Sequence, residues 1–246
     1  MKRASPHVMR RASFIAGLGL LALVWLGPLL TAWRDSVAAH MLAHMGVVAL
    51  AAPLLALGLA DRLPVALPGV FPLLPGTRKR SSSLFLRNSG RKTAAHFSWN
   101  CSGAAPVIAS LVEFVVVWGW HAPAARLWAE TSTLGTVAEQ LSFLGAGLFL
   151  WLSCLAGSHD SLSRATGAFA LLLTSMHMTL LGALMALSPR PLYGMDDVTC
   201  FGTQLSASLD QQFGAVIMLG VGGAVYLAGG VSLLAGILSA RRRGAG

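Results

Sequence analysis

Residues 36–60 read SVAAHMLAHMGVVALAAPLLALGLA and carry no formal charge. A helix of this length is long enough to cross the hydrocarbon core of a bilayer. His40 and His44 are four residues apart, so a helix places them on one face, with Met41 and Met45 in a second stripe beside them. Histidine is costly inside a membrane span and usually faces a partner, a cavity or a ligand. The stretch therefore predicts a membrane helix whose histidines need partners from the rest of the chain.

The composition of the whole chain is that of a membrane protein. Its 246 residues are 55% hydrophobic and only 11% charged, with a mean hydropathy of +0.67. A soluble domain of this size is far less apolar, so that class is excluded. The three cysteines form no CxxC motif and are far apart in sequence, so neither a disulfide framework nor a thiolate metal site is indicated.

The apolar segments predict six transmembrane helices in a single all-α membrane domain, a polytopic helix bundle over residues 1–246. The predicted helices cover about residues 12–33, 36–60, 104–125, 137–156, 166–187 and 210–239. Pro53 removes one backbone hydrogen bond and is expected to kink the second helix. Residues 61–103 are rich in lysine, arginine and proline and predict a basic loop that meets anionic headgroups on the cytoplasmic face.

The distribution of basic residues predicts how the bundle is oriented. Six spans place both termini on one side together with loop 61–103, and fifteen of the eighteen lysines and arginines lie on that side. Arg34, Arg126 and Arg190 are the three on the other side. The positive-inside rule then makes both termini cytoplasmic. The formal charge of +9 therefore indicates topology and not a nucleic-acid partner.

Histidines and methionines gather at one depth in the predicted outer half of the membrane. Neutral imidazole and thioether together suit copper, especially the cuprous ion. The predicted metal ligands are His40, His44, His121, His177, Met41 and Met45. The residues predicted to orient these ligands without binding the metal are Glu113, Asp210, Gln211 and Met176.

Each of these residues also has an ordinary structural interpretation. His121 can be an interfacial hydrogen-bonding residue, and His177 can satisfy a carbonyl of a neighbouring helix. The methionines can be packing residues, and Asp210 can compensate a helix dipole. The participation of Glu113 or Gln140 in the site is left open.

Several motifs follow one another along the chain. They are His40-Met41-x-x-His44-Met45 with Ala52-Pro53-Leu54-Leu55-x-Leu57-Gly58, Trp120-His121-x-Pro123, Leu141-Ser142-Phe143-Leu144, Leu181-Gly182-Ala183 with Pro191-Leu192-Tyr193, and Asp210-Gln211-Gln212-x-Gly214 with Met218. In this order and spacing, the chain after about Trp25 resembles the multi-spanning CtaG-type assembly factors of bacterial cytochrome c oxidase. The chain departs from that pattern at Gln140, where relatives commonly have a histidine after the glutamate, and in having six predicted spans where relatives often have seven.

The resemblance implies a non-enzymatic factor of the bacterial plasma (inner) membrane that is needed for oxidase maturation and is associated with its copper centre. Its motif histidines correspond to His40, His44, His121 and His177, with the metal site on the outer, periplasmic side. The implied partners are an oxidase subunit or another copper carrier, in addition to the lipid bilayer, and a homo-oligomer is left open.

Two other functions compete with copper delivery. His44 and His177 could be axial ligands of haem in a membrane electron carrier. Alternatively, Glu113 and the histidines could line the pathway of a metal or proton transporter. An enzyme is not predicted, because no nucleophile with an adjacent base and no pair of carboxylates stands out.

Overall fold

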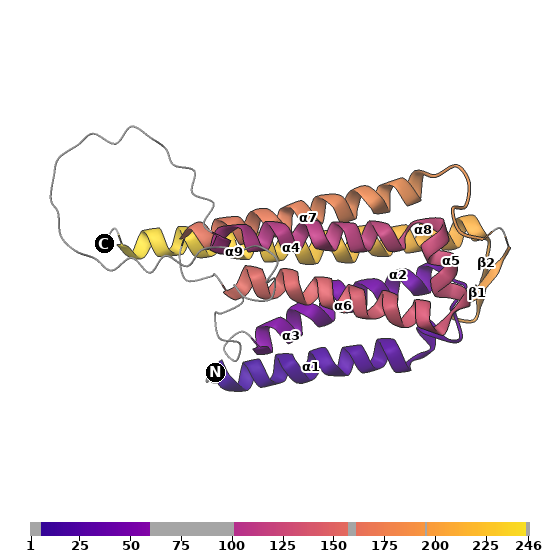
Figure 1. Cartoon of the computed structure of the whole chain (residues 1–246), viewed down its shortest axis with the longest axis horizontal. Coiled ribbons are helices and arrows are strands. Elements are labelled where there is room, and N and C mark those ends of the chain that lie inside the picture. The colour runs from indigo at the N-terminus through magenta and orange to yellow at the C-terminus, as the bar shows by residue number, and fades with distance from the viewer. Residues whose placement is uncertain (1–5, 60–100, 157–160, 195, 245–246) are drawn as a thin grey trace, which may run out of the picture.

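The computed structural model describes residues 6–59, 101–156, 161–194 and 196–244 and is an all-α helix bundle, as predicted (Figure 1). Most of the predicted basic loop 61–103 lies outside the described residues. The helices are α1 (Pro6–Leu26), α2 (Val37–Met45), α3 (Ala52–Leu59), α4 (Cys101–Trp120), α5 (Pro123–Thr131), α6 (Thr133–Ala156), α7 (Ser161–Leu187), α8 (Ala207–Ile217) and α9 (Gly223–Gly244). A 3-10 turn (Pro28–Leu30) follows α1, and two short antiparallel strands, β1 (Val198–Cys200) and β2 (Thr203–Leu205), precede α8.

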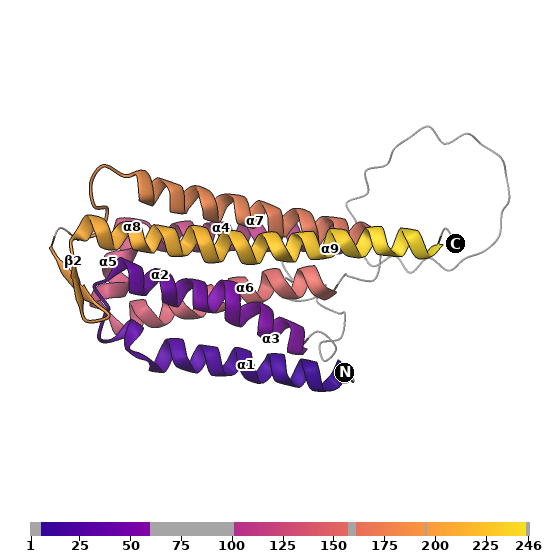
Figure 2. The same ribbon diagram turned by 180° about the vertical axis from the view of Figure 1, so that it is seen from behind.

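The protein is a multi-pass membrane protein. Within the described ranges, five helical segments are long and apolar enough to cross a bilayer, and the bent pair of α4 and α5 is a sixth candidate. The start of α1 and the end of α9 lie at the same end of the bundle (Figure 1). The opposite end, called the hairpin end below, carries α5, the two strands and the turn between α1 and α2, and the view from behind shows the same arrangement (Figure 2).

The third predicted helix does not run straight to residue 125. Instead α4 ends at Trp120, and α5 is bent from it by 72°. Pro123 disfavours the α conformation at the residue before it, and Ala122 accordingly has an extended backbone. The bend positions His121 in the turn between the two helices, at the hairpin end.

Two π-helical turns interrupt helical segments that carry buried methionines. The first, Gly46–Ala51, joins α2 to α3 just before Pro53, which has no N–H to offer the preceding turn. The second, Met218–Gly222, joins α8 to α9. A Cβ atom added at Gly222 would lie 3.3 Å from the sulfur of Met45, so glycine permits this close approach. π-helical turns are frequent at functional sites, and here one of them contains Gly222, which lies against Met45.

Candidate metal site

Three of the four predicted histidine ligands come together near the hairpin end. His40 and His44 project from α2, and His121 comes from the turn after α4. Their ring centroids are 6.5 Å apart for His40 and His44, 6.0 Å for His40 and His121, and 5.5 Å for His44 and His121. All three side chains are buried. We call these three residues the histidine cluster.

Buried thioethers border the histidine cluster. The sulfur of Met41 lies 3.5 Å from Nε2 of His121. A Cβ atom added at Gly222 would meet both Met45, from α2, and Met178, from α7. Met41, Met45 and Met178 are buried in one core together with Met185 and Met218. One soft sulfur donor, that of Met41, therefore lies beside an imidazole ring, and further buried thioethers belong to the same core.

Hydrogen bonds fix the tautomer of His121. Its Nδ1 lies 2.6 Å from the carbonyl oxygen of Val117, which can only accept, so Nδ1 carries the proton. The lone pair of Nε2 is then directed to the Met41 side. Tyr193 donates its hydroxyl to the carbonyl oxygen of His121 at 2.8 Å. Burial raises the pKa of Tyr193 to about 12, so this phenol stays neutral and remains a donor.

The ring of His40 is held between an arginine and a glutamate. Nη1 of Arg126 lies 2.6 Å from Nδ1 of His40, and a guanidinium can only donate, so Nδ1 accepts and the proton of the neutral ring is on Nε2. That Nε2 faces Oε1 of Glu139 at 3.7 Å. Arg126 also pairs with Glu130 at 2.8 Å and donates to the carbonyl oxygen of Arg34 at 3.3 Å. Arg126 therefore occupies the one lone pair that His40 could offer a metal.

Several buried ring nitrogens have no hydrogen-bond partner among the described residues. They include both nitrogens of His44, both of His177 and Nε2 of His40. The ring of His44 packs edge-on against Phe143, with centroids 4.0 Å apart. An unpartnered buried polar group costs about 1–3 kcal/mol of stability, so a cluster of them is expected to have a role beyond packing.

His177 does not join the ring contacts of the other three predicted histidine ligands. Its ring packs edge-on against Phe114, with centroids 5.3 Å apart, in the interior between α4 and α7. Its two unpartnered nitrogens make it a second polar position beside the buried methionines and not a member of the histidine cluster.

The donor set suits copper, but the ligand atoms do not converge as they stand. Within the described ranges, no group of three or more His, Cys, Asp or Glu side chains is arranged to hold a metal ion. Two imidazoles that share a metal at about 2.1 Å per nitrogen have ring centroids no more than about 6.5 Å apart. The three ring separations lie within that limit, so the distances between the rings do not exclude a shared metal.

Asp210 supports the site differently from the prediction. It does not orient an imidazole but binds the first turn of α2 from α8. Its carboxylate accepts from Ser36 Oγ at 2.7 Å, from Val37 N at 2.6 Å and from Ala38 N at 3.2 Å. A carboxylate at a helix N-terminus satisfies free N–H groups and the helix dipole. Asp210 thereby fixes the helix that carries His40 and His44.

The other predicted helpers lie away from the histidine cluster. Gln211 accepts from Leu192 N at 2.6 Å and donates to the carbonyl oxygen of Met185 at 2.9 Å, which joins α8 to the end of α7. Glu113 accepts the hydroxyl of Tyr226 at 2.5 Å. Met176 is 62% exposed and faces outward, whereas Met178 is buried. Gln140, left open above, accepts from Trp25 at 3.2 Å.

Sequence reasoning did not identify the residues that control the ring of His40. The sequence indicates Arg126 only as a basic residue on the less basic side, and it gives Glu139 no role beyond being the glutamate before Gln140. Both are buried. An ionisable residue within or beside a span is a signal of a specific partner, so Glu139 could have been proposed from its place in an apolar helix. No sequence pattern paired it with His40.

Comparison with known proteins agrees with the motifs. The family model described as cytochrome c oxidase caa3 assembly factor matches residues 1–240. A search of curated proteins and a search of solved structures each found no match. The family match extends across α1 to α8 and most of α9, so the predicted resemblance is confirmed.

Proposed function

Because this chain belongs to the cytochrome c oxidase caa3 assembly factor family, we propose that it binds cuprous ion through its buried histidines and methionines and passes it to a maturing oxidase. The observation that carries the proposal is the burial of His44, whose two ring nitrogens have no hydrogen-bond partner in the described part of the chain, next to His121, which in turn lies beside the sulfur of Met41. Imidazole and thioether are suitable donors for the cuprous ion.

The contacts of the three cluster histidines suit transient binding of copper better than storage. His44 and His121 can bind copper first, because neither has a cationic neighbour donating to it. His40 can join only after Arg126 moves, since a metal at Nδ1 would displace the guanidinium. A metal at Nε2 would require the ring proton to move to Nδ1, where it would face an N–H donor. A site with few available ligands, in which His40 is blocked by Arg126, favours release of the copper.

The proposal places the hairpin end on the outer side of a bacterial plasma membrane. The described helix ends at the opposite end of the bundle carry Arg10, Arg11, Arg164 and Arg242, and the positive-inside rule makes that end cytoplasmic. Copper would then be acquired and released near the outer surface. Its recipient would be an oxidase subunit or another copper carrier.

The experiment is metal analysis of the full chain purified in detergent and loaded anaerobically with cuprous ion. The native chain is compared with the double variant His40→Ala and His44→Ala. We expect near-stoichiometric copper in the native chain and background copper in the double variant. The matched control is His7→Ala, which removes an exposed imidazole at the start of α1 and should leave copper unchanged.

Equal copper in the native chain and the double variant would contradict the proposal. An absorption spectrum of the same samples tests the haem alternative, which requires a Soret band that depends on His44. Thermal unfolding of each variant distinguishes loss of the site from loss of the fold.

A further inference from the structure

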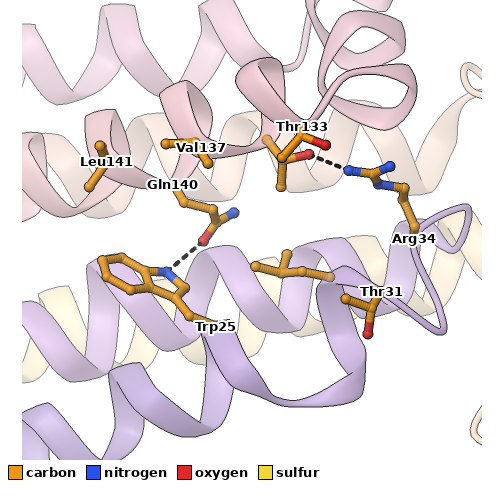
Figure 3. Close-up of a pocket in the computed structure, with 9 residues that line it drawn as sticks. Trp25, Thr31, Arg34, Thr133, Val137, Gln140 and Leu141 are labelled. Carbon is orange, nitrogen blue, oxygen red and sulfur yellow. Dashed lines mark hydrogen bonds between the residues drawn. The ribbon is translucent and has the colours of Figure 1, made fainter.

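A cavity of about 590 Å³ opens between α1 and α6, near the hairpin end (Figure 3). α1 packs mainly on α3 and the π-helical turn before it, and the Trp25–Gln140 hydrogen bond links it to α6 across the cavity. Its lining includes Trp25, Arg34, Thr133, Val137, Gln140 and Leu141. A volume of this size is typical of a site for one small molecule.

The cavity has a polar end and an apolar end. Arg34 and Thr133 lie at the hairpin end, whereas Trp25 and Leu141 lie farther along the helices (Figure 3). Thr133 and Gln140 are separated by about 10 Å along α6, from the helical rise. The polar end is therefore at headgroup depth and the apolar end is in the hydrocarbon region. Val137 and Leu141 are half exposed on the outer face of α6, so the cavity opens sideways to the surrounding lipid.

Arg34 gives the polar end a positive charge. Its Nη2 donates to Thr136 Oγ1 at 2.7 Å, and its Nε is buried with no hydrogen-bond partner among the described residues. The ion pairs found among the described residues, His40–Glu139 and Arg126–Glu130, do not involve it. A partly buried guanidinium with unused donors favours an anion that accepts several hydrogen bonds, such as a phosphate.

We infer that this cavity binds one anionic phospholipid of the surrounding bilayer, with the phosphate on Arg34 and an acyl chain along Trp25, Val137 and Leu141. The polarity of the cavity matches that of the lipid along the membrane normal, and its charge complements the headgroup. The hydroxyl of Thr133 lies at the same end and can donate to a phosphate oxygen.

The bound headgroup covers one side of the histidine cluster. A smaller cavity of about 10 Å³ shares Leu30, Arg34 and Thr136 with the large one and is also lined by His40 and Glu139. The carbonyl oxygen of Arg34 accepts from Arg126, which holds His40. A phospholipid on Arg34 thus lies next to the arginine that blocks His40. The inference itself requires no copper.

The test is native mass spectrometry of the detergent-purified full chain titrated with phosphatidylglycerol or, separately, with phosphatidylcholine. We expect the first phosphatidylglycerol to bind at least about tenfold more tightly than the first phosphatidylcholine. Arg34→Gln should weaken phosphatidylglycerol binding by about tenfold and phosphatidylcholine binding by clearly less, because the choline cation already offsets the phosphate charge of that lipid. The matched control is Arg190→Gln, which removes an exposed arginine after α7 and should have no effect.

A second variant tests the inference even if Arg34→Gln fails to fold. Val137→Trp fills the cavity from the exposed face of α6 and should reduce phosphatidylglycerol binding to a similar extent. Equal affinity for the two lipids would overturn the inference and leave the cavity to an apolar segment of a partner. Equal losses in Arg34→Gln and Arg190→Gln would also overturn it, because they would indicate general surface charge.

Discussion

The buried polar groups in the first two turns of α2 differ in whether they have hydrogen-bond partners. At the first turn, three donors from Ser36, Val37 and Ala38 all bind the carboxylate of Asp210. Less than two turns farther on, both ring nitrogens of His44 are unpartnered among the described residues, and the ring lies against Phe143. Both regions are buried in the same bundle.

This difference separates a structural polar group from one available for a ligand. At the start of α2, where the polar contacts only hold the helix in position, the buried donors all have an acceptor. A general lack of partners therefore does not explain why the nitrogens of His44 have none among the described residues. A satisfied buried network stabilises a fold, whereas an unsatisfied one costs stability. We therefore expect substitutions in the two turns to have opposite consequences for stability and for copper.

The largest effect is expected from Asp210→Ala. The change removes the acceptor of three hydrogen bonds and leaves two N–H groups at the start of α2 unsatisfied. The free energy of unfolding should fall by about 3 kcal/mol or more. Thermal unfolding in detergent measures the loss, and Asp197→Ala, which removes an exposed carboxylate, is the control. A similar unfolding temperature in both variants would remove the structural half of the comparison.

Arg126→Met should act on copper in the opposite direction from a ligand substitution. It removes both the donor that occupies Nδ1 of His40 and a positive charge close to the bound cation. We expect affinity for cuprous ion to rise by about tenfold, measured by competition with a chelator. The free energy of unfolding should fall by about 1–3 kcal/mol, since Glu130 loses its partner.

Arg126→Lys is the control for that variant because it keeps the charge. Its copper affinity should stay near that of the native chain. An unchanged or lower affinity in Arg126→Met would show that Arg126 does not compete with copper for His40.

Met45→Leu should separate packing from ligation. Leucine fills nearly the same volume, so the free energy of unfolding should change by less than about 1.5 kcal/mol. Copper affinity should fall by about three- to tenfold, because a soft sulfur donor is lost. Met176→Leu changes an exposed thioether and should affect neither quantity. Equal copper affinities in the two variants would assign Met45 to packing alone.

The smallest effect is expected from Tyr193→Phe. The change removes one hydrogen bond, that to the carbonyl oxygen of His121, and should lower the free energy of unfolding by about 1 kcal/mol. Copper stoichiometry should stay the same, because the His121 ring remains fixed by Val117. Chemical denaturation measures the first quantity and metal analysis the second. Loss of copper would show that the turn, and not the ring tautomer, positions His121.

The sequence predicts those parts of the site that depend on helical periodicity. The spacing of His40 and His44 fixes their common face, and Trp120-His121-x-Pro123 indicates a helix end at the same depth. Helical periodicity predicts less at His177. Met176 and Met178 flank this residue on opposite sides, and spacing alone does not say which of the two is buried. The predicted residue, Met176, is the exposed one.

Contacts between segments that are far apart in the chain cannot be predicted from this sequence alone. The sequence predicts Glu113 as a carboxylate that orients a metal ligand, but it precedes His121 by about 12 Å along α4 and binds Tyr226 of α9 instead. The capping of α2 by Asp210, which is far away in sequence, follows from how the helices pack. The bend before Pro123 was within reach, since the residue before proline avoids the α conformation.

The most direct test of the account is to measure copper content and thermal stability together in His44→Leu. Leucine replaces a buried ring that has no hydrogen-bond partner among the described residues, so the fold should not lose stability. We predict that copper falls from about one ion per chain to background while the unfolding temperature stays the same or rises. Unchanged copper, or copper lost together with a fall in stability like that of Asp210→Ala, would contradict a ligand role for His44.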